Sequence, residues 1–526
     1  MSTAPKSTKS PEVPKAKSRK SAFTEHGLNG TVDQLCTEIR ELYLADNVPW
    51  IVGYSGGKDS TATLQLVWRA LRELPEDKRT KTVYVISTDT LVENPVVAAW
   101  VTRSLEVMEG EAMRQRMPIA TRRLTPETEE SFWVNLIGKG YPAPRRKFRW
   151  CTERLKIRPS NRFIMSVVSQ NGEAILLLGA RKAESSVRAH IMERNTKYRV
   201  RDRLSPNPTL PGCMVYTPVE DWSNDDVWMF LQQIPNPWGH NNKELLGMYA
   251  GATADGECPL VVDTSTPSCG DSRFGCWVCT LVEKDKSMAA MVQNDQEKEW
   301  MLPLLELRNA LDFRNNAASV DEDSSDHHLR DFRRMSGVVQ LMYDGQTLVP
   351  GPYTQEARER WLQRLLEAQA WIQKNGPKDV RGFELISIKD LQEIRRIWVV
   401  EKHELEDNLP RIYERAMETK YPRPSLDDGL AMEAEDIALL RATCGDDKLH
   451  FQLTRELLSV VRQNDSSHRR AGHYDRLEKA FVRHFFKDAE DAADYARRRK
   501  QVRDQAENGE LPPSDKPESS QAEPLF

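Results

Sequence analysis

A glycine-rich turn between two patterned segments is the part of this chain whose residues best suit chemistry. The turn reads Tyr54-Ser-Gly-Gly-Lys-Asp-Ser-Thr61. Apolar residues precede it and a helical pattern follows it, so the context predicts a strand, a tight turn and a helix. The first turn of a helix carries unpaired N–H groups and the positive end of the helix dipole, and glycines let a ligand approach the backbone. The segment therefore predicts a phosphate-binding loop.

Several groups in this turn could bind a phosphate. The backbone supplies N–H groups, a lysine supplies mobile positive charge, and three residues supply hydroxyls. The acidic residue could orient Mg²⁺ or the loop, or could simply be the favourable negative charge at a helix start. The candidate ligands are Ser55, Gly56, Gly57, Lys58, Asp59, Ser60 and Thr61. The spacing differs from that of the common G-x-x-x-x-G-K-[ST] loop, and a glycine turn without a ligand is the alternative.

A cluster of cysteines is the second feature that could do chemistry. Cys276-Trp-Val-Cys279 forms a C-x-x-C motif, Cys258 and Cys269 precede it, and Cys151 stands apart. The chain shows neither an apolar run long enough to cross a bilayer nor an apolar N-terminal signal core, so we expect a cytoplasmic protein. In that compartment metal or redox chemistry explains clustered cysteines better than disulfides do. Spacing alone leaves zinc and an iron–sulfur cluster equally open, and a sulfur-carrying pair or unliganded buried thiols would also fit.

Strands that alternate with helices must position these groups. Residues 48–54, 82–87 and 174–178 are rich in apolar and β-branched side chains, which indicates buried strands. Helical patterns lie between them, so we expect an α/β fold with a parallel sheet and helices on both faces. Ligands of such sheets bind at the carboxyl ends of the strands. The glycine turn, Ser87-Thr88-Asp89 and Gly179-Ala180-Arg181 all fall at such ends.

Composition divides the remaining chain. Residues 1–22 hold six basic residues and one acidic residue among serines and prolines, and residues 506–526 are rich in Pro, Ser and Glu, so we expect two disordered tails. Residues 23–290 carry the strand and cysteine motifs, and residues 291–505 show helical patterns throughout, which predicts a mostly helical C-terminal domain. The formal net charge of −4 gives no overall attraction to nucleic acid, so any contact with DNA requires local basic patches.

Five stretches of the sequence, residues 54–61, 88–95, 150–156, 179–188 and 269–279, carry a resemblance to a known family. Together they resemble the DndC family of DNA phosphorothioation sulfurtransferases. The S-G-G-K-D-S sequence is typical of the PP-loop ATP pyrophosphatases, and the stretches together resemble the phosphoadenylylsulfate reductase branch of that superfamily. The cysteine stretch, with a single upstream cysteine, is more specific than the loop.

The resemblance implies a fold, cofactors and an activity. It implies an adenine nucleotide α-hydrolase-like sheet, ATP with Mg²⁺, a [4Fe–4S] cluster held by the cysteine loop, and cleavage of ATP between its α- and β-phosphates with release of pyrophosphate. Reductases of this branch that hold a cluster use a Cys-Cys pair, whereas Thr152 follows the single upstream cysteine here. The implied cluster ligands are Cys151, Cys269, Cys276 and Cys279, with Cys258 as the alternative fourth ligand.

The resemblance also assigns roles around the nucleotide. Ser87 and Asp89 would contact the adenosine. Gly179 and Arg181 would lie near the α-phosphate, where the guanidinium would stabilise developing charge. Glu184 could hold Arg181 in place or could be an ordinary surface charge. The expected catalytic residues are Lys58, Asp59 and Arg181.

The expected function is ATP-dependent insertion of sulfur into the DNA backbone within a phosphorothioate restriction–modification system. The family implies a cysteine desulfurase as sulfur donor, ATPase and DNA-binding proteins of the same complex as partners, and no membrane. Basic patches at residues 145–158 and 194–203 could contact DNA, although charge runs are often only solvated surface. Competing hypotheses are a sulfonucleotide reductase, a tRNA-thiolating enzyme of the same superfamily, and a non-enzymatic nucleotide-sensing scaffold. The basic patches and the additional helical region favour DNA modification over the reductase.

Overall fold

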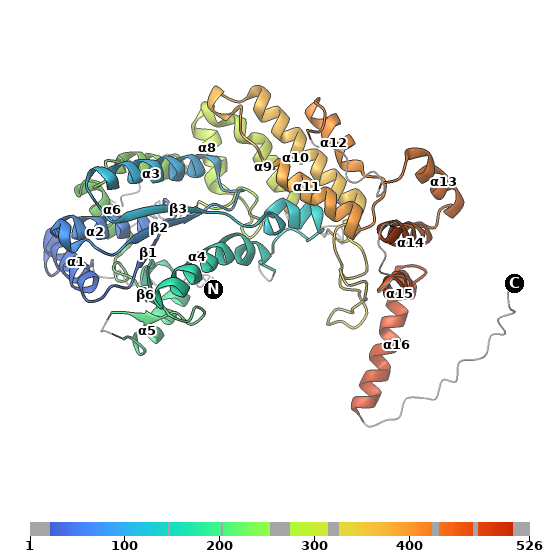
Figure 1. The fold of residues 1–526 in the computed structure, drawn as a ribbon, viewed down its shortest axis with the longest axis horizontal. Helices are drawn as coiled ribbons and strands as arrows, with labels where there is room; N and C mark the ends of the chain where they lie inside the picture. Colours follow the sequence, from blue (N-terminus) through green and yellow to red (C-terminus); the bar gives the residue numbers. More distant parts are fainter. Residues whose placement is uncertain are drawn as a thin grey trace, which may run out of the picture. The chain divides into compact units, whose positions relative to one another are not determined.

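The computed structural model describes residues 21–145, 148–200, 203–252, 274–313, 326–422, 431–465 and 472–508 (Figure 1). The chain forms two compact units. The first, which we call the sheet unit, comprises residues 1–89, 94–124 and 158–274. The second, the helical unit, comprises residues 90–93, 125–157 and 275–526. The predicted boundaries near residues 23, 290 and 505 stay predictions, and the two tails fall almost entirely outside the described residues.

A six-stranded sheet forms the centre of the sheet unit, in the order β3-β2-β1-β4-β6-β5. Its strands are β1 (Trp50–Gly53), β2 (Val83–Thr88), β3 (Ile119–Leu124), β4 (Ala174–Leu177), β5 (Ser205–Pro206) and β6 (Cys213–Tyr216). All neighbours pair in parallel except β5 and β6. The chain continues from β1 to β2 on one side, whereas β4 lies on the other. The strand order therefore reverses beside β1, which creates the crevice where such sheets bind ligands.

Alternation along the strands produces two apolar cores, one on each face of the sheet. Trp50 and Val52 of β1 point into the larger core, and Ile51 points into the smaller one. The larger core is covered by α1 (Gly27–Leu44), α2 (Lys58–Arg72), α3 (Pro95–Arg114), α6 (Asn224–Gln233) and α7 (Asn242–Gly251). The helix α4 (Arg158–Asn171) covers the smaller one, and Figure 1 shows it across the sheet from α2 and α3. The predicted α/β fold is confirmed.

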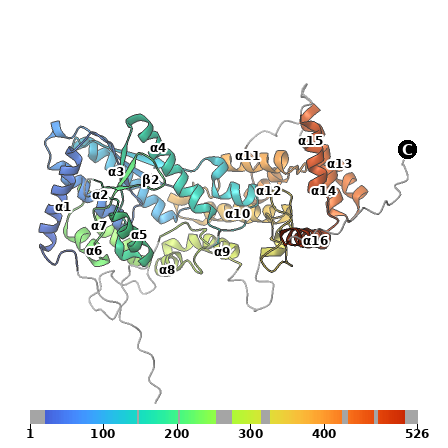
Figure 2. The ribbon, with the colours of Figure 1, turned by 90° about the horizontal axis from the view of Figure 1, so that it is seen from below.

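The helical unit confirms the predicted helical C-terminal region. Its helices are α8 (Lys286–Asn294), α9 (Leu302–Leu311), α10 (Gln355–Asn375), α11 (Ile388–Arg396), α12 (Asn408–Met417), α13 (Ala434–Cys444), α14 (Lys448–Asp465), α15 (His473–Arg483) and α16 (Ala489–Glu507). Figures 1 and 2 both show α10 beside α11 and α12. An earlier segment of the chain joins this unit through buried indole N–H groups. Trp133 donates to the Leu385 carbonyl at 2.9 Å, and Trp398 donates to the Ile137 carbonyl at 3.0 Å.

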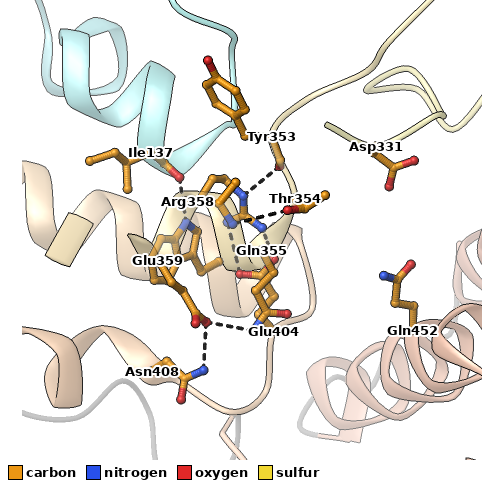
Figure 3. Close-up of polar contacts among 12 residues, drawn as sticks. Ile137, Asp331, Tyr353, Thr354, Gln355, Arg358, Glu359, Glu404, Asn408 and Gln452 are labelled. Atoms are coloured by element: carbon orange, nitrogen blue, oxygen red, sulfur yellow. Dashed lines mark hydrogen bonds and ion pairs between the residues drawn. The ribbon is translucent and has the colours of Figure 1, made fainter. Parts of the chain in front are cut away.

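A buried ion pair fixes the start of α10. Arg358 is only 3% exposed and donates to both carboxylate oxygens of Glu404, one of them at 3.2 Å, and to the Tyr353 carbonyl at 3.2 Å (Figure 3). Its guanidinium also lies 5.3 Å from the centre of the Trp398 ring. Buried charges are tolerated only when partners satisfy them, so these contacts hold α10 in one position. Within the described part of the chain, no helix is long and apolar enough to cross a membrane.

Candidate functional site

The glycine turn joins the end of β1 to the start of α2, as the sequence predicted. Gly56 has a φ of +74°, a conformation that L-residues rarely adopt. A Cβ atom on Gly56 would lie 2.5 Å from Cγ2 of Val101, so packing also requires glycine there. The indole N–H of Trp100 donates to the Gly56 carbonyl at 3.1 Å. This bond directs the Gly56 carbonyl toward α3, so a residue outside the glycine turn stabilises its conformation.

The hydroxyls of the turn mostly stabilise the turn itself. Ser60 donates to the Gly57 carbonyl at 3.0 Å, and its oxygen accepts the Ser55 N–H at 3.2 Å. The two serine hydroxyls lie 3.2 Å apart. Thr61 is 2% exposed, and its N–H donates to the Gly57 carbonyl at 3.0 Å. The structure thus brings the three predicted hydroxyl ligands together, with Thr61 behind the surface of the loop.

Two nearly buried cations share one carboxylate at the start of α2. The Nε of Arg181 donates to Oδ1 of Asp59 at 2.6 Å, and the Nζ of Lys58 lies 3.4 Å from Oδ2. Arg181 is 3% exposed and Lys58 is 7% exposed. Arg181 also donates to the Trp222 carbonyl at 3.2 Å, so its guanidinium is fixed from two sides. The three groups carry one net positive charge at a helix N-terminus, which suits an anionic ligand.

Gly179 brings the end of β4 against this helix start. A Cβ atom there would lie 2.6 Å from the carbonyl carbon and oxygen of Asp59, so only glycine permits the approach. Glu184 accepts the backbone N–H of Arg181 at 2.9 Å and pairs with Arg188. Glu184 therefore shapes the backbone at Arg181, while Asp59 orients the guanidinium.

The predicted adenosine contacts lie at the same edge of the sheet. The N–H of Tyr54 donates to the Ile86 carbonyl at 2.8 Å, which places the start of the turn beside the end of β2. Ser87 follows at once and is 4% exposed. The Asp89 carboxylate accepts from Nε of Arg123 at 3.1 Å. Ser87 and Asp89 thus share the sheet edge with the turn, and their role toward adenosine stays a prediction.

Sequence reasoning missed two aromatic residues at this site. Trp100 holds the glycine turn, and the hydroxyl of Tyr249 lies 3.4 Å from the N–H nitrogen of Lys58. The ammonium of Lys58 stands 5.4 Å from the centre of the Tyr249 ring. Both aromatics lie on helices distant in sequence from the turn, and no local pattern distinguishes them from ordinary core residues.

Three of the predicted cluster ligands occur together in the helical unit. Cys151 precedes a π-helical segment (Thr152–Ile157), and the Cys279 N–H donates to the Cys276 carbonyl at 3.0 Å across a turn. Burial and then the Glu93 carboxylate raise the pKa of Cys276 to about 12. Burial raises the pKa of Cys151 as well, and the charge of Cys279 adds to both shifts. Cys279 is therefore near enough to both Cys151 and Cys276 to affect their charged forms.

Charged groups around these thiols were not recognised in the sequence. The Thr90 hydroxyl lies 3.3 Å from Sγ of Cys276 and 3.0 Å from Oε1 of Glu93. The ammonium of Lys156 lies 3.4 Å from the same carboxylate oxygen. Burial lowers the pKa of Lys156, but the charges of Cys276 and Glu93 outweigh that effect and raise the pKa. A cation thus stands next to the thiols.

A fully buried arginine supports the C-x-x-C turn. Arg308 on α9 donates from Nε to the Cys279 carbonyl at 3.0 Å and from another nitrogen to the Glu283 carbonyl at 3.1 Å. It also pairs with Asp312 at 3.1 Å. These bonds fix the backbone that carries the second cysteine of the motif.

The donor set can be compared with the predicted cluster. Among the described residues, no three His, Cys, Asp or Glu side chains form a group that could hold a metal ion. The remaining two candidate ligands, Cys258 and Cys269, lie outside the described residues. Thiolate ligands, beside the buried Trp277 and the cation of Lys156, suit an iron–sulfur cluster or zinc by their chemistry.

Many cations of the two predicted DNA patches are paired with acids. In the first patch, Arg145 pairs with Asp326 and Lys156 pairs with Glu93. In the second, Arg199 donates to both carboxylate oxygens of Glu220, at 2.7 and 2.8 Å. Such pairs cancel much of the positive potential that the sequence indicated. Arg146, Lys147 and Arg201 lie outside the described residues.

Known proteins resemble part of the chain. Residues 49–237 match the phosphoadenosine phosphosulfate reductase domain family. An uncharacterized protein of Methanocaldococcus jannaschii is 28% identical over 200 residues, which are 38% of this chain and 35% of the relative, so the chain spans about a third of that relative's length. Because no activity is stated for that relative, the match assigns no function to this chain.

Two solved structures show low similarity to this chain. The U34-tRNA thiolase NcsA of Methanococcus maripaludis, which has a [4Fe–4S] cluster, shows 14% identity and a TM-score of 0.26 over 42% of this chain and 71% of its own. The FMN adenylyltransferase of Candida glabrata shows 11% identity and a TM-score of 0.25 over 52% and 77%. The family match agrees with the glycine turn and the sheet: residues 49–237 are similar to a nucleotide-using domain of the PP-loop superfamily.

Proposed function

We propose that the protein is an ATP pyrophosphatase and sulfurtransferase that activates a DNA backbone phosphate for replacement of one oxygen by sulfur. The observation that carries this proposal is the arrangement of Lys58, Asp59 and Arg181 on the glycine turn at the start of α2. The matched family uses a sulfonucleotide, so a sulfonucleotide reductase is the second candidate. A tRNA-thiolating enzyme is a third candidate with the same loop.

The turn has the groups that adenylyl transfer requires. N–H groups of the first turn of α2 and the Lys58 ammonium would bind the β- and γ-phosphates with Mg²⁺, and Arg181 would face the α-phosphate. A DNA oxygen would attack the α-phosphorus, the α–β bond would break, and pyrophosphate would leave. Charge grows on the leaving group, and fixed cations that need no reorganisation stabilise it. A reduced sulfur nucleophile would then displace AMP together with that oxygen.

Asp59 acts in this scheme as a positioning residue. It holds Arg181 and Lys58 through opposite carboxylate oxygens, so both cations are in place before the nucleotide binds. Preorganised charge is more effective than charge that must move during the reaction. The roles that the sequence left open for Asp59, orienting Mg²⁺ or the loop or supplying a helix-start charge, stay predictions beside this one.

The cysteine site would handle sulfur. Cys151, Cys276 and Cys279, with Cys269 or Cys258 as the fourth ligand, would hold a [4Fe–4S] cluster, which could bind sulfur or shape the substrate pocket. Arg308 fixes the C-x-x-C turn, and Lys156 offers positive charge beside it. A cysteine desulfurase would supply the sulfur, and DNA, an ATPase and a DNA-binding protein of the same system would be the partners.

One experiment tests the proposal. The full chain is purified without oxygen, its iron and sulfide are measured, and pyrophosphate release from ATP is followed with and without DNA. Release of pyrophosphate that DNA stimulates supports the proposal, while tRNA stimulation alone would favour the thiolating enzyme. Turnover of a sulfonucleotide without pyrophosphate release would favour the reductase.

The cysteine role has its own variant. Cys276→Ser should abolish DNA phosphorothioate in cells and lower iron per chain, whereas Cys213→Ser should do neither. Cys213 is a buried cysteine in β6 of the sheet unit. A colourless wild-type protein that contains zinc would contradict the cluster.

A further inference from the structure

Tyr249 stands at the mouth of the phosphate-binding turn although it lies on α7, far from the turn in sequence. Its oxygen is 3.4 Å from the backbone nitrogen of Lys58. A Cβ atom on Gly57 would come within 3.2 Å of the same oxygen, so the tyrosine is one reason for glycine there. The hydroxyl oxygen therefore lies where an acceptor of a free N–H group at a helix N-terminus would lie.

We propose that Tyr249 binds the nucleotide directly, by donating its phenolic hydrogen to an oxygen of the pyrophosphate part of ATP. The inference rests on the proposed function, because it names a further binding residue of that same site. The hydroxyl would accept from Lys58 N–H and donate to the phosphate, which adds a side-chain donor to the backbone donors of α2.

The ring of Tyr249 is held so that its hydroxyl cannot turn away freely. Trp228 contacts the ring edge-on with centroids 5.1 Å apart, and Phe274 does so at 4.7 Å. The Lys58 ammonium lies 5.4 Å from the ring centre. Edge-to-face and cation–π contacts of this kind restrict the orientation of an aromatic ring. The donor is therefore preorganised, which reduces the entropy lost when a ligand binds.

A bound ligand would supply the acceptor that the hydroxyl hydrogen of Tyr249 lacks among the described residues. Tyr249 is 6% exposed, and in the described part of the chain its oxygen serves as an acceptor for Lys58 without an acceptor for its own hydrogen. A buried donor left unpaired is unfavourable. Burial raises the pKa of Tyr249, so the hydrogen stays on the oxygen at physiological pH. A phosphate oxygen is the acceptor that the adjacent helix start and the two cations would attract.

Tyr249→Phe tests the contact because it removes only the hydroxyl and keeps the ring beside Lys58. The probes are the Mg²⁺ complex of α,β-methylene-ATP, which cannot be cleaved at the relevant bond, and inorganic pyrophosphate. Isothermal titration should show binding about 10- to 100-fold weaker for both probes, the range for one hydrogen bond to a charged group. AMP, which lacks the pyrophosphate part, should bind the variant and the wild type equally.

Tyr43→Phe is the matched control. Tyr43 is 2% exposed in the same unit, and its hydroxyl donates to the Lys81 carbonyl before β2, at the opposite edge of the sheet. This variant should bind both probes as the wild type does. Equal or tighter binding of the two probes by Tyr249→Phe would overturn the inference and leave the proposed function intact. If Tyr249→Phe bound both probes more weakly but the wild type released no pyrophosphate from ATP, the proposed function would be overturned instead.

Discussion

Removing the charge of Asp59 while keeping its shape tests how the two cations of the nucleotide site are held. In Asp59→Asn, Arg181 keeps an oxygen acceptor and its bond to the Trp222 carbonyl, but it and Lys58 lose their shared counter-charge. Breaking a fully buried pair costs about 3–5 kcal/mol. The Asp59 side chain is 23% exposed and asparagine still accepts one hydrogen bond, so we expect the free energy of unfolding to fall by about 2 kcal/mol. Hydrogen exchange in peptides of α2 and residues 174–184 should report it.

The Asp59→Asn change should slow catalysis without weakening the binding of ATP. Without the charge of Asp59, Arg181 is held less firmly, and the loss of about 1.5–3 kcal/mol of its interaction with the transition state should lower the rate of pyrophosphate release about 10- to 100-fold. Ground-state binding of pyrophosphate should not weaken, because the site gains positive charge relative to the wild type. We therefore expect kcat to fall while KM for ATP stays equal or decreases. A bound nucleotide should also restore part of the lost protection from exchange.

The control for this experiment is Asp225→Asn. Asp225 is also an acidic residue in the first turn of a helix, α6, but it is exposed and has no ion pair among the described contacts. Its substitution should change stability by about 0.5 kcal/mol or less and leave the kinetics unaltered. If Asp59→Asn released pyrophosphate at the wild-type rate with unchanged exchange, the idea that Asp59 positions the cations would be refuted.

Three further predictions concern groups that hold the two sites and the helical unit. Trp100→Phe removes the donor to the carbonyl of the glycine turn, so the affinity for α,β-methylene-ATP should fall several-fold in titration calorimetry, about 1 kcal/mol for one neutral hydrogen bond. Arg308→Met unpairs the Cys279 carbonyl, and iron per chain should fall by more than half in anaerobic protein whose circular dichroism is unchanged. The third group is Glu456 in α14: burial alone would raise the pKa of its carboxyl, but the hydrogen bond to His484 outweighs burial and lowers the pKa. The stabilisation that this carboxylate provides at neutral pH should be lost as the pH falls below about 4.5. Protection from hydrogen exchange in α14 and α15 should therefore fall between pH 7 and pH 4 more in the wild type than in Glu456→Gln.

The sheet was predictable because each of its central strands is marked locally. Runs such as Thr82–Ser87 are β-branched and apolar, and buried parallel strands require that composition. The position of residues 125–157 was not predictable. Their place in the helical unit depends on bonds such as that from Trp398 to Ile137, between residues far apart in the sequence. No local pattern encodes a partner at that separation.

The two sites differ in how far sequence alone could describe them. The glycine turn was fully readable, since strand, turn and helix follow one another along the chain. The surroundings were not: Tyr249 and Trp100 reach the turn from other helices, and Glu93 and Lys156 reach Cys276 in the same way. The sequence also could not show that several cations of the basic patches pair with carboxylates, such as Arg199 with Glu220, and the role of these patches toward DNA stays a prediction.

The covalent chain passes between the two sites at two places. Asp89 belongs to the sheet unit and pairs there with Arg123, whereas the next residue, Thr90, contacts Cys276 in the helical unit. Phe274 packs on Tyr249 in the sheet unit, and Cys276 follows two residues later. Residues that would sense the nucleotide are thus only one or two positions from residues that surround the thiols. In the proposed function, a displacement of Asp89 on nucleotide binding would reach Thr90, which contacts Cys276, through a single peptide bond.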